Sequence, residues 1–235
     1  MIDFHSHILP QVDDGSASLE MSITMLRMEY EQGVHTVVAT PHFYARHDTP
    51  ARFLERRNSA EQRLREALLA CESVPEIHVG AEVAFFSGMS ESDALQDLCI
   101  RGTKYILVEM PMSSWSDTMY DELVHIRERA GLIPIVAHID RYLSPFHVRK
   151  IMDRLEELPV LVQMNAEYLL NKHTTRTALR LIREERVQLL GSDCHNLGSR
   201  APNLGAAAQK LRDRLGEEIP LQMEETGWMV LKKTR

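Results

Sequence analysis

The sequence contains few cysteines, and their spacing matches no cysteine framework. Three cysteines (Cys71, Cys99 and Cys194) occur among 235 residues, and no C-x-x-C pair is present. An odd and sparse set of this kind argues against a disulfide framework and against a zinc-finger site. Disulfide-free chains are typical of reducing compartments, so we expect a cytoplasmic protein.

Long hydrophobic runs and basic blocks are also missing. No apolar run reaches membrane-spanning length, and the first five residues (MIDFH) lack the charged and apolar segments of a signal peptide. We therefore expect no membrane insertion and no export. The 27 Lys and Arg against 34 Asp and Glu give a formal net charge of -7. Nucleic-acid affinity depends on cations that neutralise phosphates, so no nucleic-acid partner is expected.

Short apolar, β-branched segments recur along the chain. Each is too short for a helix and lacks strict alternation, which is typical of parallel strands buried on both faces. Helical patterns separate most of them, for example residues 19–32, which end at Gly33, and residues 119–130, which end at Gly131. The seven predicted strands are 2–4, 36–39, 77–79, 105–108, 133–136, 160–163 and 187–190.

Alternating strands and helices predict an α/β fold, either a (β/α) barrel or a doubly wound sheet. No linker, internal repeat or shift in composition divides the chain, so a single domain over 1–235 is expected. We favour the barrel because candidate functional residues follow almost every predicted strand. In barrels the chemistry gathers at the carboxyl ends of strands drawn from the whole chain.

The segment Asp3–His7 (DFHSH) is the first such strand end. In an extended chain residues i and i+2 point to the same side, so His5 and His7 could hold one metal ion together. An isolated H-x-H pair is more often two polar residues that leave a strand. The metal interpretation therefore depends on matching ligands elsewhere.

Imidazole and carboxylate side chains do follow the other predicted strands. Asp193 and His195 repeat the i, i+2 spacing of the first pair. Nine candidate ligands are too many for one ion and suit two or three ions bridged by carboxylates. Without metal, so many buried carboxylates would repel one another at a heavy desolvation cost. The candidates are His5, His7, Asp14, His42, Glu82, Glu109, His138, Asp193 and His195.

Each candidate also has a simpler interpretation. Asp14 precedes Gly15 and Ser16, so it could be only a turn or N-cap residue. Glu82 could cap a helix or form a salt bridge, and His42 could be a satisfied core histidine. His47, in the loop after His42, could contact substrate. Five other histidines lack the strand-end pattern and are interpreted as structural or surface residues: His35, His78, His125, His147 and His173. The sixth predicted strand is followed only by Asn165 and Glu167, which are interpreted as structural.

The ordered motifs resemble those of a known family. They are FHSH (4–7) with DDGS (13–16), ATPH (39–42), GAE (80–82), EMP (109–111), AH (137–138) and SDCH (192–195). In this order they resemble the polymerase-and-histidinol-phosphatase (PHP) superfamily. Within it the chain resembles the bacterial manganese-dependent protein-tyrosine phosphatases of capsule and exopolysaccharide operons, the CpsB/CapC type. The resemblance runs from residue 2 to about residue 205 and implies a distorted (β/α)7 TIM-like barrel, the PHP fold.

The resemblance further implies a site with three metal ions. Manganese is favoured by the family, and iron or zinc would also accept such mixed ligands. By the family pattern, one ion would bind His5, His7, Glu82 and Asp193. Glu82 would bridge to a second ion, which Glu109 and His138 also hold, and Asp14, His42 and His195 would bind a third.

Two arginines complete the pattern, Arg141 and Arg200. A planar guanidinium can hold phosphate through two parallel hydrogen bonds, although either residue alone could be an ordinary surface arginine. The resemblance implies that a metal-bridging hydroxide attacks the phosphorus of phosphotyrosine. The substrate would be the tail of a bacterial tyrosine autokinase that regulates capsule synthesis. Many relatives carry Glu where this chain has Asp140, which affects the surroundings of the site and not its ligands.

Three other functions fit parts of the pattern. The same ligands could serve a small-molecule phosphatase, such as one for histidinol phosphate. A non-catalytic binding module could retain the fold. Residues 194–200 also satisfy C-x5-R, the spacing of cysteine-dependent tyrosine phosphatases. This last alternative is disfavoured because the intervening residues form a poor anion cradle and Asp193 would raise the pKa of the Cys194 thiol.

Overall fold

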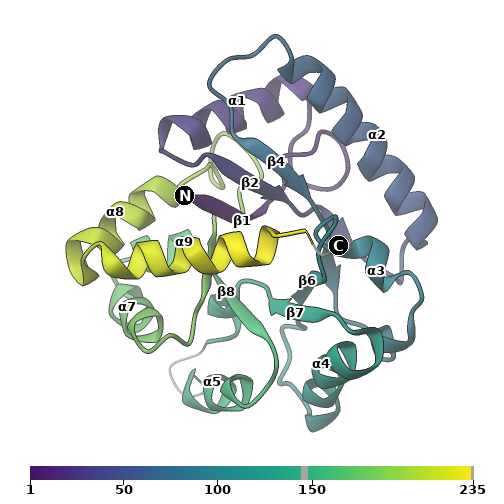
Figure 1. The fold of residues 1–235 in the computed structure, drawn as a ribbon, viewed down its shortest axis with the longest axis vertical. Helices are drawn as coiled ribbons and strands as arrows, with labels where there is room; N and C mark the ends of the chain where they lie inside the picture. The colour runs from purple at the N-terminus through teal and green to yellow at the C-terminus, as the bar shows by residue number, and fades with distance from the viewer. Residues whose placement is uncertain (144–147, 234–235) are drawn as a thin grey trace.

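The computed structural model describes residues 1–143 and 148–233, so His147 lies outside the described residues. Parallel strands form the centre of the molecule, and helices surround them (Figure 1). The strands in the described ranges are β1 (Ile2–Ser6), β2 (Thr36–Ala39), β3 (His42–Phe43), β4 (Glu76–Val79), β5 (Glu82–Ala84), β6 (Tyr105–Glu109), β7 (Ile133–Val136), β8 (Leu161–Asn165) and β9 (Leu189–Gly191).

The helices follow the predicted alternation. Helix α1 starts at the N-cap Ser18, whose hydroxyl accepts from Met21 N, and Gly33 follows it with a φ of +82°. The α-helices are α1 (Leu19–Glu31), α2 (Pro50–Leu68), α3 (Leu95–Leu98), α4 (Asp117–Ala130), α5 (Val148–Glu156), α6 (Ala166–Leu170), α7 (Thr175–Arg183), α8 (Leu204–Leu215) and α9 (Glu218–Leu231). Two 3-10 helices are η1 (Met89–Glu91) and η2 (Ile139–Tyr142).

Two of the predicted strands continue past a break, which the sequence patterns did not show. Strand β3 follows β2 after Thr40 and Pro41, and β5 follows β4 after Gly80 and Ala81. The sheet order changes there: β1, β2 and β4 form one sheet, and β3, β5, β6, β7, β8 and β9 form the other. In the second sheet His42 is paired in register with Glu82, so the breaks bring two candidate ligands side by side.

The carboxyl ends of the first and last strands also meet. Ser6 and Cys194 form a parallel bridge, Asp193 N donates to His5 O at 2.7 Å, and His7 N donates to Cys194 O at 2.9 Å. The strands therefore curl into a distorted barrel with seven positions around it, and the doubly wound sheet is excluded. The segments that hold His5, His7, Asp193 and His195 are joined directly at this seam.

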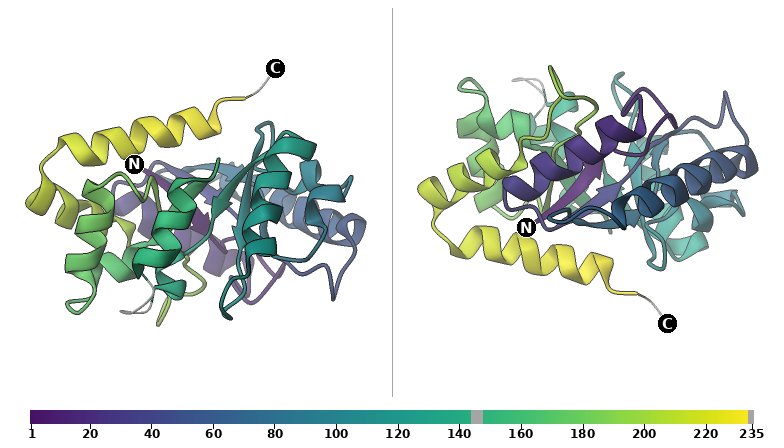
Figure 2. Two further views of the ribbon diagram at one scale, coloured as in Figure 1. Left: turned by 90° about the horizontal axis from the view of Figure 1, so that it is seen from below. Right: turned by 90° about the horizontal axis from the view of Figure 1, so that it is seen from above.

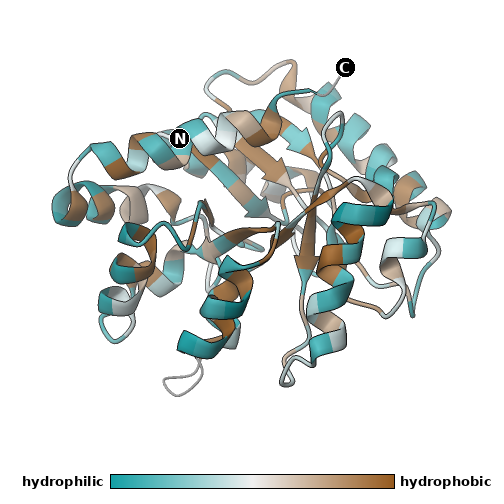
Figure 3. Ribbon diagram, turned by 60° about the horizontal axis from the view of Figure 1, so that its bottom comes forward, coloured by the Kyte–Doolittle hydropathy of each residue, from teal (hydrophilic) through white to brown (hydrophobic). Residues whose placement is uncertain are grey.

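Apolar residues fill the space between the strands and the surrounding helices, and the helices turn hydrophilic residues outward (Figure 3). Helix α9 lies across the end of the barrel where the N-terminus is found, opposite the loops that follow the strands (Figure 2). The Met1 amino group contacts Glu224 on this helix at 2.8 Å. In the described ranges, no helix combines the length and apolar character that a membrane crossing needs.

The seam has no room for a side chain at Gly191. A Cβ there would lie 2.5 Å from His5 Cβ and 2.9 Å from His5 N. We expect Gly191→Ala to lower the free energy of unfolding by about 1–3 kcal/mol, because β9 must move away from β1. Urea denaturation measures this. Gly198→Ala is the matched control, since its Cβ would meet only Asn196 Oδ1 at 3.6 Å. Equal stability of the two variants would contradict the tight seam.

Candidate metal centre

All nine candidate ligands lie at the carboxyl ends of strands or in the loops that follow them, and they converge on one basin. His5, His7, Glu82 and His138 are fully buried. Asp193 and His195 are nearly so, and His42 and Glu109 are partly exposed. The Asp14 side chain is 68% exposed, so it reaches the basin from the solvent side.

Glu82 lies at the centre of the basin. Its Oε2 atom is 2.9 Å from His42 Nδ1, 3.1 Å from His5 Nε2 and 3.3 Å from His7 Nε2. Its Oε1 atom is 2.7 Å from His138 Nε2. One carboxylate thus touches four imidazoles from three different strand ends. The alternative interpretation of Glu82 as a helix cap is wrong, because it opens strand β5.

Asp193 completes a compact set with the first histidine pair. Its Oδ1 is 3.6 Å from His5 Nε2 and 3.4 Å from His7 Nε2, and these two nitrogens are 3.1 Å apart. Glu82 Oε2 faces the same nitrogens. Four potential ligand atoms therefore surround one small volume.

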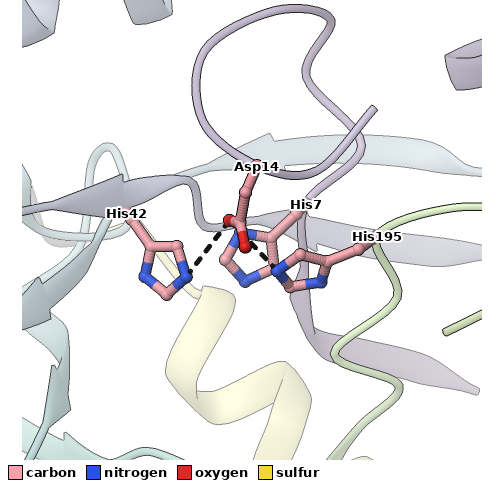
Figure 4. A group of neighbouring side chains, drawn as sticks. All are labelled: His7, Asp14, His42 and His195. Carbon is pink, nitrogen blue, oxygen red and sulfur yellow. Dashed lines mark ion pairs between the residues drawn. The ribbon is translucent and has the colours of Figure 1, made fainter. Parts of the chain in front are cut away.

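A second group lies at the outer rim (Figure 4). Asp14 Oδ1 is 3.5 Å from His42 Nε2 and 3.4 Å from His195 Nε2. His7 offers an atom within 4.8 Å of all three. Asp14 is not the N-cap of α1, which is Ser18, and it is Asp13 that accepts the turn hydrogen bond from Gly15 N. The simpler interpretation of Asp14 therefore loses its support.

Glu109 forms a third neighbourhood on the other side of Glu82. Its Oε1 is 3.6 Å from His138 Nε2. His42, Glu82 and Glu109 also bring ligand atoms within 4.8 Å of one another. His7 and His42 thus each lie in two of these neighbourhoods. The family pattern assigns each of them to a single metal ion.

The electrostatics of the basin fit divalent cations. Burial alone would raise the pKa of Glu82, but the charge of His5 and the hydrogen bond with His138 hold it well below its usual value. Burial would lower the pKa of His138, yet hydrogen bonds to Glu109 and Glu82 raise it to about 9. Glu82 Oε2 and His195 Nε2 are buried without a hydrogen-bond partner in the described part of the chain. Ionised carboxylates and unpaired imidazole nitrogens are the donors that such ions need.

The two predicted arginines lie at the edge of this basin. Arg141 Nη2 donates to Asp193 Oδ2 at 2.5 Å, and Arg200 Nη2 is 2.7 Å from Asp193 Oδ1. Both side chains are about one-third exposed and line a pocket with Asn165 and Ser192. Two guanidinium groups therefore face an open pocket directly beside the candidate ligand Asp193.

Similarity to known proteins agrees with this geometry. The family model for capsular polysaccharide synthesis proteins, CpsB/CapC, matches residues 1–225. The chain belongs to the CpsB/CapC family. It is 30% identical to the tyrosine-protein phosphatase CpsB of Streptococcus agalactiae serotype III over 95% of this chain and 94% of that protein. It is 29% identical to the tyrosine-protein phosphatase YwqE of Bacillus subtilis over 99% of this chain and 92% of that protein.

A solved structure matches over the whole chain. It is one of the crystal structures of YwqE from Bacillus subtilis and CpsB from Streptococcus pneumoniae, described as unique metal-dependent tyrosine phosphatases. The TM-score is 0.86 at 26% identity, covering 100% of this chain and 96% of that one. The fold expected for a CpsB/CapC protein, a distorted α/β barrel, is therefore confirmed.

Three residues to which the sequence analysis gave no role in the site contact candidate ligands of this CpsB/CapC chain. Asp13 Oδ2 lies 2.6 Å from His7 Nδ1 and accepts from His42 N at 2.9 Å. Gln163 Oε1 lies 3.2 Å from His5 Nδ1 and accepts from His138 N at 2.6 Å. Such outer contacts fix the ring orientation of metal-binding histidines.

Asn165 is the third, and its interpretation as merely structural was incomplete. Its Nδ2 donates to Asp193 Oδ2 at 2.9 Å, and its backbone N donates to Asp140 Oδ1 at 2.8 Å. Asp140, the residue that is Glu in many relatives, thus positions Asn165, and Asn165 in turn positions Asp193. The sequence does contain a signal for this role. Gln163 and Asn165 are two residues apart at the end of a buried strand, and buried amide side chains need hydrogen-bond partners.

We expect Asp13→Asn to weaken metal binding by about 10- to 100-fold while the protein stays folded. The His7 contact contributes most to the low pKa of Asp13, about 2, against a burial effect of opposite sign. The neutral amide would lose this charge-assisted contact. Metal titration of the purified variant measures the change. Asp117→Asn, on the exposed start of α4, is the control; unaltered metal affinity in Asp13→Asn would refute the orienting role.

The C-x5-R alternative does not fit the structure. Cys194 is fully buried, its Sγ faces Glu29 Oε1 at 3.8 Å, and burial raises the pKa of the thiol well above its usual value. A protonated thiol away from the arginine pocket is a poor nucleophile. We expect Cys194→Ser to retain turnover within about twofold, since serine keeps a small polar group there. A variant that binds metal but has no activity would reinstate the thiol mechanism.

The remaining candidate, His47, lies beside the basin. It lines a pocket with Asp14, His42 and Tyr44, and its ring meets the Tyr44 ring edge-on with centroids 6.3 Å apart. Tyr44 in turn stacks on His42, with ring centroids 5.1 Å apart. The expected contact between His47 and substrate stays a prediction.

Proposed function

We propose that this CpsB/CapC protein hydrolyses phosphotyrosine on a protein substrate with the help of bound divalent metal ions. The observation that carries the proposal is the convergence of nine imidazole and carboxylate side chains beside two arginines that face an open pocket. The relatives described as metal-dependent tyrosine phosphatases support the same chemistry.

Three manganese ions are the proposed cofactors, with iron or zinc as chemically acceptable substitutes. His5, His7, Glu82 and Asp193 would hold one ion. Glu82 would be shared with a second, held by Glu109 and His138, and Asp14, His42 and His195 would hold the third. Bound ions of this kind supply Lewis acidity and lower the pKa of water.

The side chains have separate tasks in this proposal. Arg141 and Arg200 bind the non-transferred phosphoryl oxygens and stabilise the charge that develops on them. A phenol has a pKa of about 10, so the leaving phenolate needs little protonation and no general acid is assigned. Asp13, Gln163 and Asn165 keep the ligands in place throughout.

The proposed substrate is the tail of a bacterial tyrosine autokinase in the cytoplasm, whose dephosphorylation would regulate capsule or exopolysaccharide synthesis. The capsular family supports this assignment. One domain over 1–235 would suffice, because strands from both ends of the chain contribute to the same basin.

Turnover of a phosphotyrosine peptide and of histidinol phosphate by the same metal-loaded preparation tests the proposal. We expect a kcat/KM at least about tenfold higher for the peptide, loss of turnover with a chelator, and recovery with Mn²⁺. A preference for histidinol phosphate would favour a small-molecule phosphatase. Binding of the peptide by manganese-loaded protein without phosphate release would favour a non-catalytic module.

A further inference from the structure

A basic pocket lies on the outside of the barrel, although the sequence has no basic block. It lies between α7 and α8, which pack against each other (Figure 1). Its volume of about 840 Å³ is within the range of ligand-binding pockets. No acidic side chain lines it. The six cations of this α7–α8 basic pocket are Lys172, Arg176, Arg180, Arg183, Lys210 and Arg214.

These cations are not neutralised by the protein itself. Within residues 1–143 and 148–233, none of the six forms an ion pair with a carboxylate. Lys210 donates to the Leu169 and Leu170 carbonyls, and the others are exposed. A chain of net charge -7 therefore concentrates unpaired positive charge at one place.

Two of the cations lie where helix stability does not favour them, whereas Arg180, Arg183 and Arg214 lie in the last turns of α7 and α8, where the dipole favours cations. Arg176 and Arg180 are four residues apart on α7, where like charges repel. Arg176 lies in the first turn of α7 and Lys172 lies two residues before its N-cap, at the end where the helix dipole disfavours cations and the first turn has no acidic residue. Six unpaired cations around one concave pocket of an otherwise acidic molecule, two of them at a helix end that disfavours positive charge, point to an anionic ligand.

The pocket adjoins the arginine pocket of the candidate site. Asn171 and Thr174 line the arginine pocket, and the intervening Lys172 and the next residue, Thr175, line the basic one. Arg180 lies near enough to Tyr168, in the arginine pocket, to lower its pKa against the larger effect of burial. A single polypeptide could therefore occupy both pockets.

We propose that the α7–α8 basic pocket binds an acidic segment of the same polypeptide whose phosphotyrosine enters the arginine pocket. The proposal rests on the proposed function. Carboxylates or further phosphates on a flexible chain match the unpaired cations in charge. A concave pocket that adjoins the site favours an extended chain over a flat membrane surface.

Steady-state kinetics with three substrates tests this proposal: phosphotyrosine alone, a phosphotyrosine peptide with neutral flanks, and the same peptide with an acidic flank. For the wild type we expect the acidic flank to lower KM about tenfold at low salt, with little change in kcat. Added salt should remove this advantage, because the charges are exposed.

The test variant is Lys172→Glu with Arg176→Glu. It should raise KM for the acidic peptide about tenfold and leave turnover of phosphotyrosine alone unchanged. Its Tm should be equal or higher, because acidic residues suit the start of α7; a purely structural role predicts a lower Tm. The charge-matched control is Arg63→Glu with Arg127→Glu, on α2 and α4 across the barrel, which should keep the wild-type KM.

Failure of this inference can be separated from failure of the proposed function. If the wild type turns over phosphotyrosine but does not distinguish acidic from neutral flanks, the docking proposal is wrong and the phosphatase stands. If no phosphotyrosine substrate is turned over, the function itself is wrong. Binding to phosphatidylglycerol vesicles that is lost in the test variant, with unchanged peptide KM, would replace the peptide by a membrane surface.

Discussion

Glu82→Gln is expected to lower kcat/KM for a phosphotyrosine peptide by about a thousandfold or more and to reduce the bound metal. Glu82 contacts four histidines from three strand ends, and both of its carboxylate oxygens face imidazole nitrogens. Glutamine keeps the size of the side chain but loses its charge and one acceptor oxygen. Metal analysis and steady-state kinetics of the same preparation measure both effects.

The matched control for this variant is Glu61→Gln. Glu61 is also buried, but it lies on α2 and pairs with Arg65 and Arg101 away from the basin. It should keep the wild-type metal content and turnover even if its Tm falls. Full metal content and full activity in Glu82→Gln would show that the basin is not the metal centre.

Replacement of the arginines should give the second large effect. We expect Arg141→Ala and Arg200→Ala each to lower kcat/KM by about a hundredfold, because each removes a preorganised donor to the phosphoryl group. Lysine at either position should recover only part of the loss, since an ammonium cannot form the two parallel hydrogen bonds of a guanidinium. The metal content should not change. This measurement distinguishes arginines that bind phosphate from arginines that only position Asp193.

Arg129→Ala is the control for these variants. Arg129 pairs with Glu91 at 2.7 Å on the exposed face of α4, and its loss should leave kcat/KM unaltered. If Arg141→Ala and Arg200→Ala lost metal in proportion to activity, the arginines would act through Asp193 and not on phosphate.

Much of the candidate site could be predicted from the sequence because a parallel barrel gathers strand ends regardless of its detailed packing. His5, Glu82, His138 and Asp193 are far apart in sequence, yet each lies one to three residues after a predicted apolar strand. Once these strands run parallel around one axis, their carboxyl ends must share one face. The prediction of a single basin required only this topology.

Other features depend on contacts that no local pattern reports. Strand β3 has two residues after Pro41, which is too short for a periodic signal. Gln163 and Asn165 are neutral amides, so their support of the ligands emerges only when β8 lies beside β7 and β9. The basic pocket likewise draws its cations from α8, α7 and the turn before α7, and strand β9 and its loop separate the two helices in the sequence.

Anomalous X-ray scattering from crystals grown with Mn²⁺, recorded at the manganese absorption edge, tests the central claim most directly. The account predicts peaks inside the basin: one bordered by His5, His7 and Asp193, one beside Glu109 and His138, and one beside Asp14 and His195. Each would lie about 2.0–2.3 Å from its ligand atoms. Fully occupied manganese elsewhere on the molecule, with no peak in the basin, would contradict it.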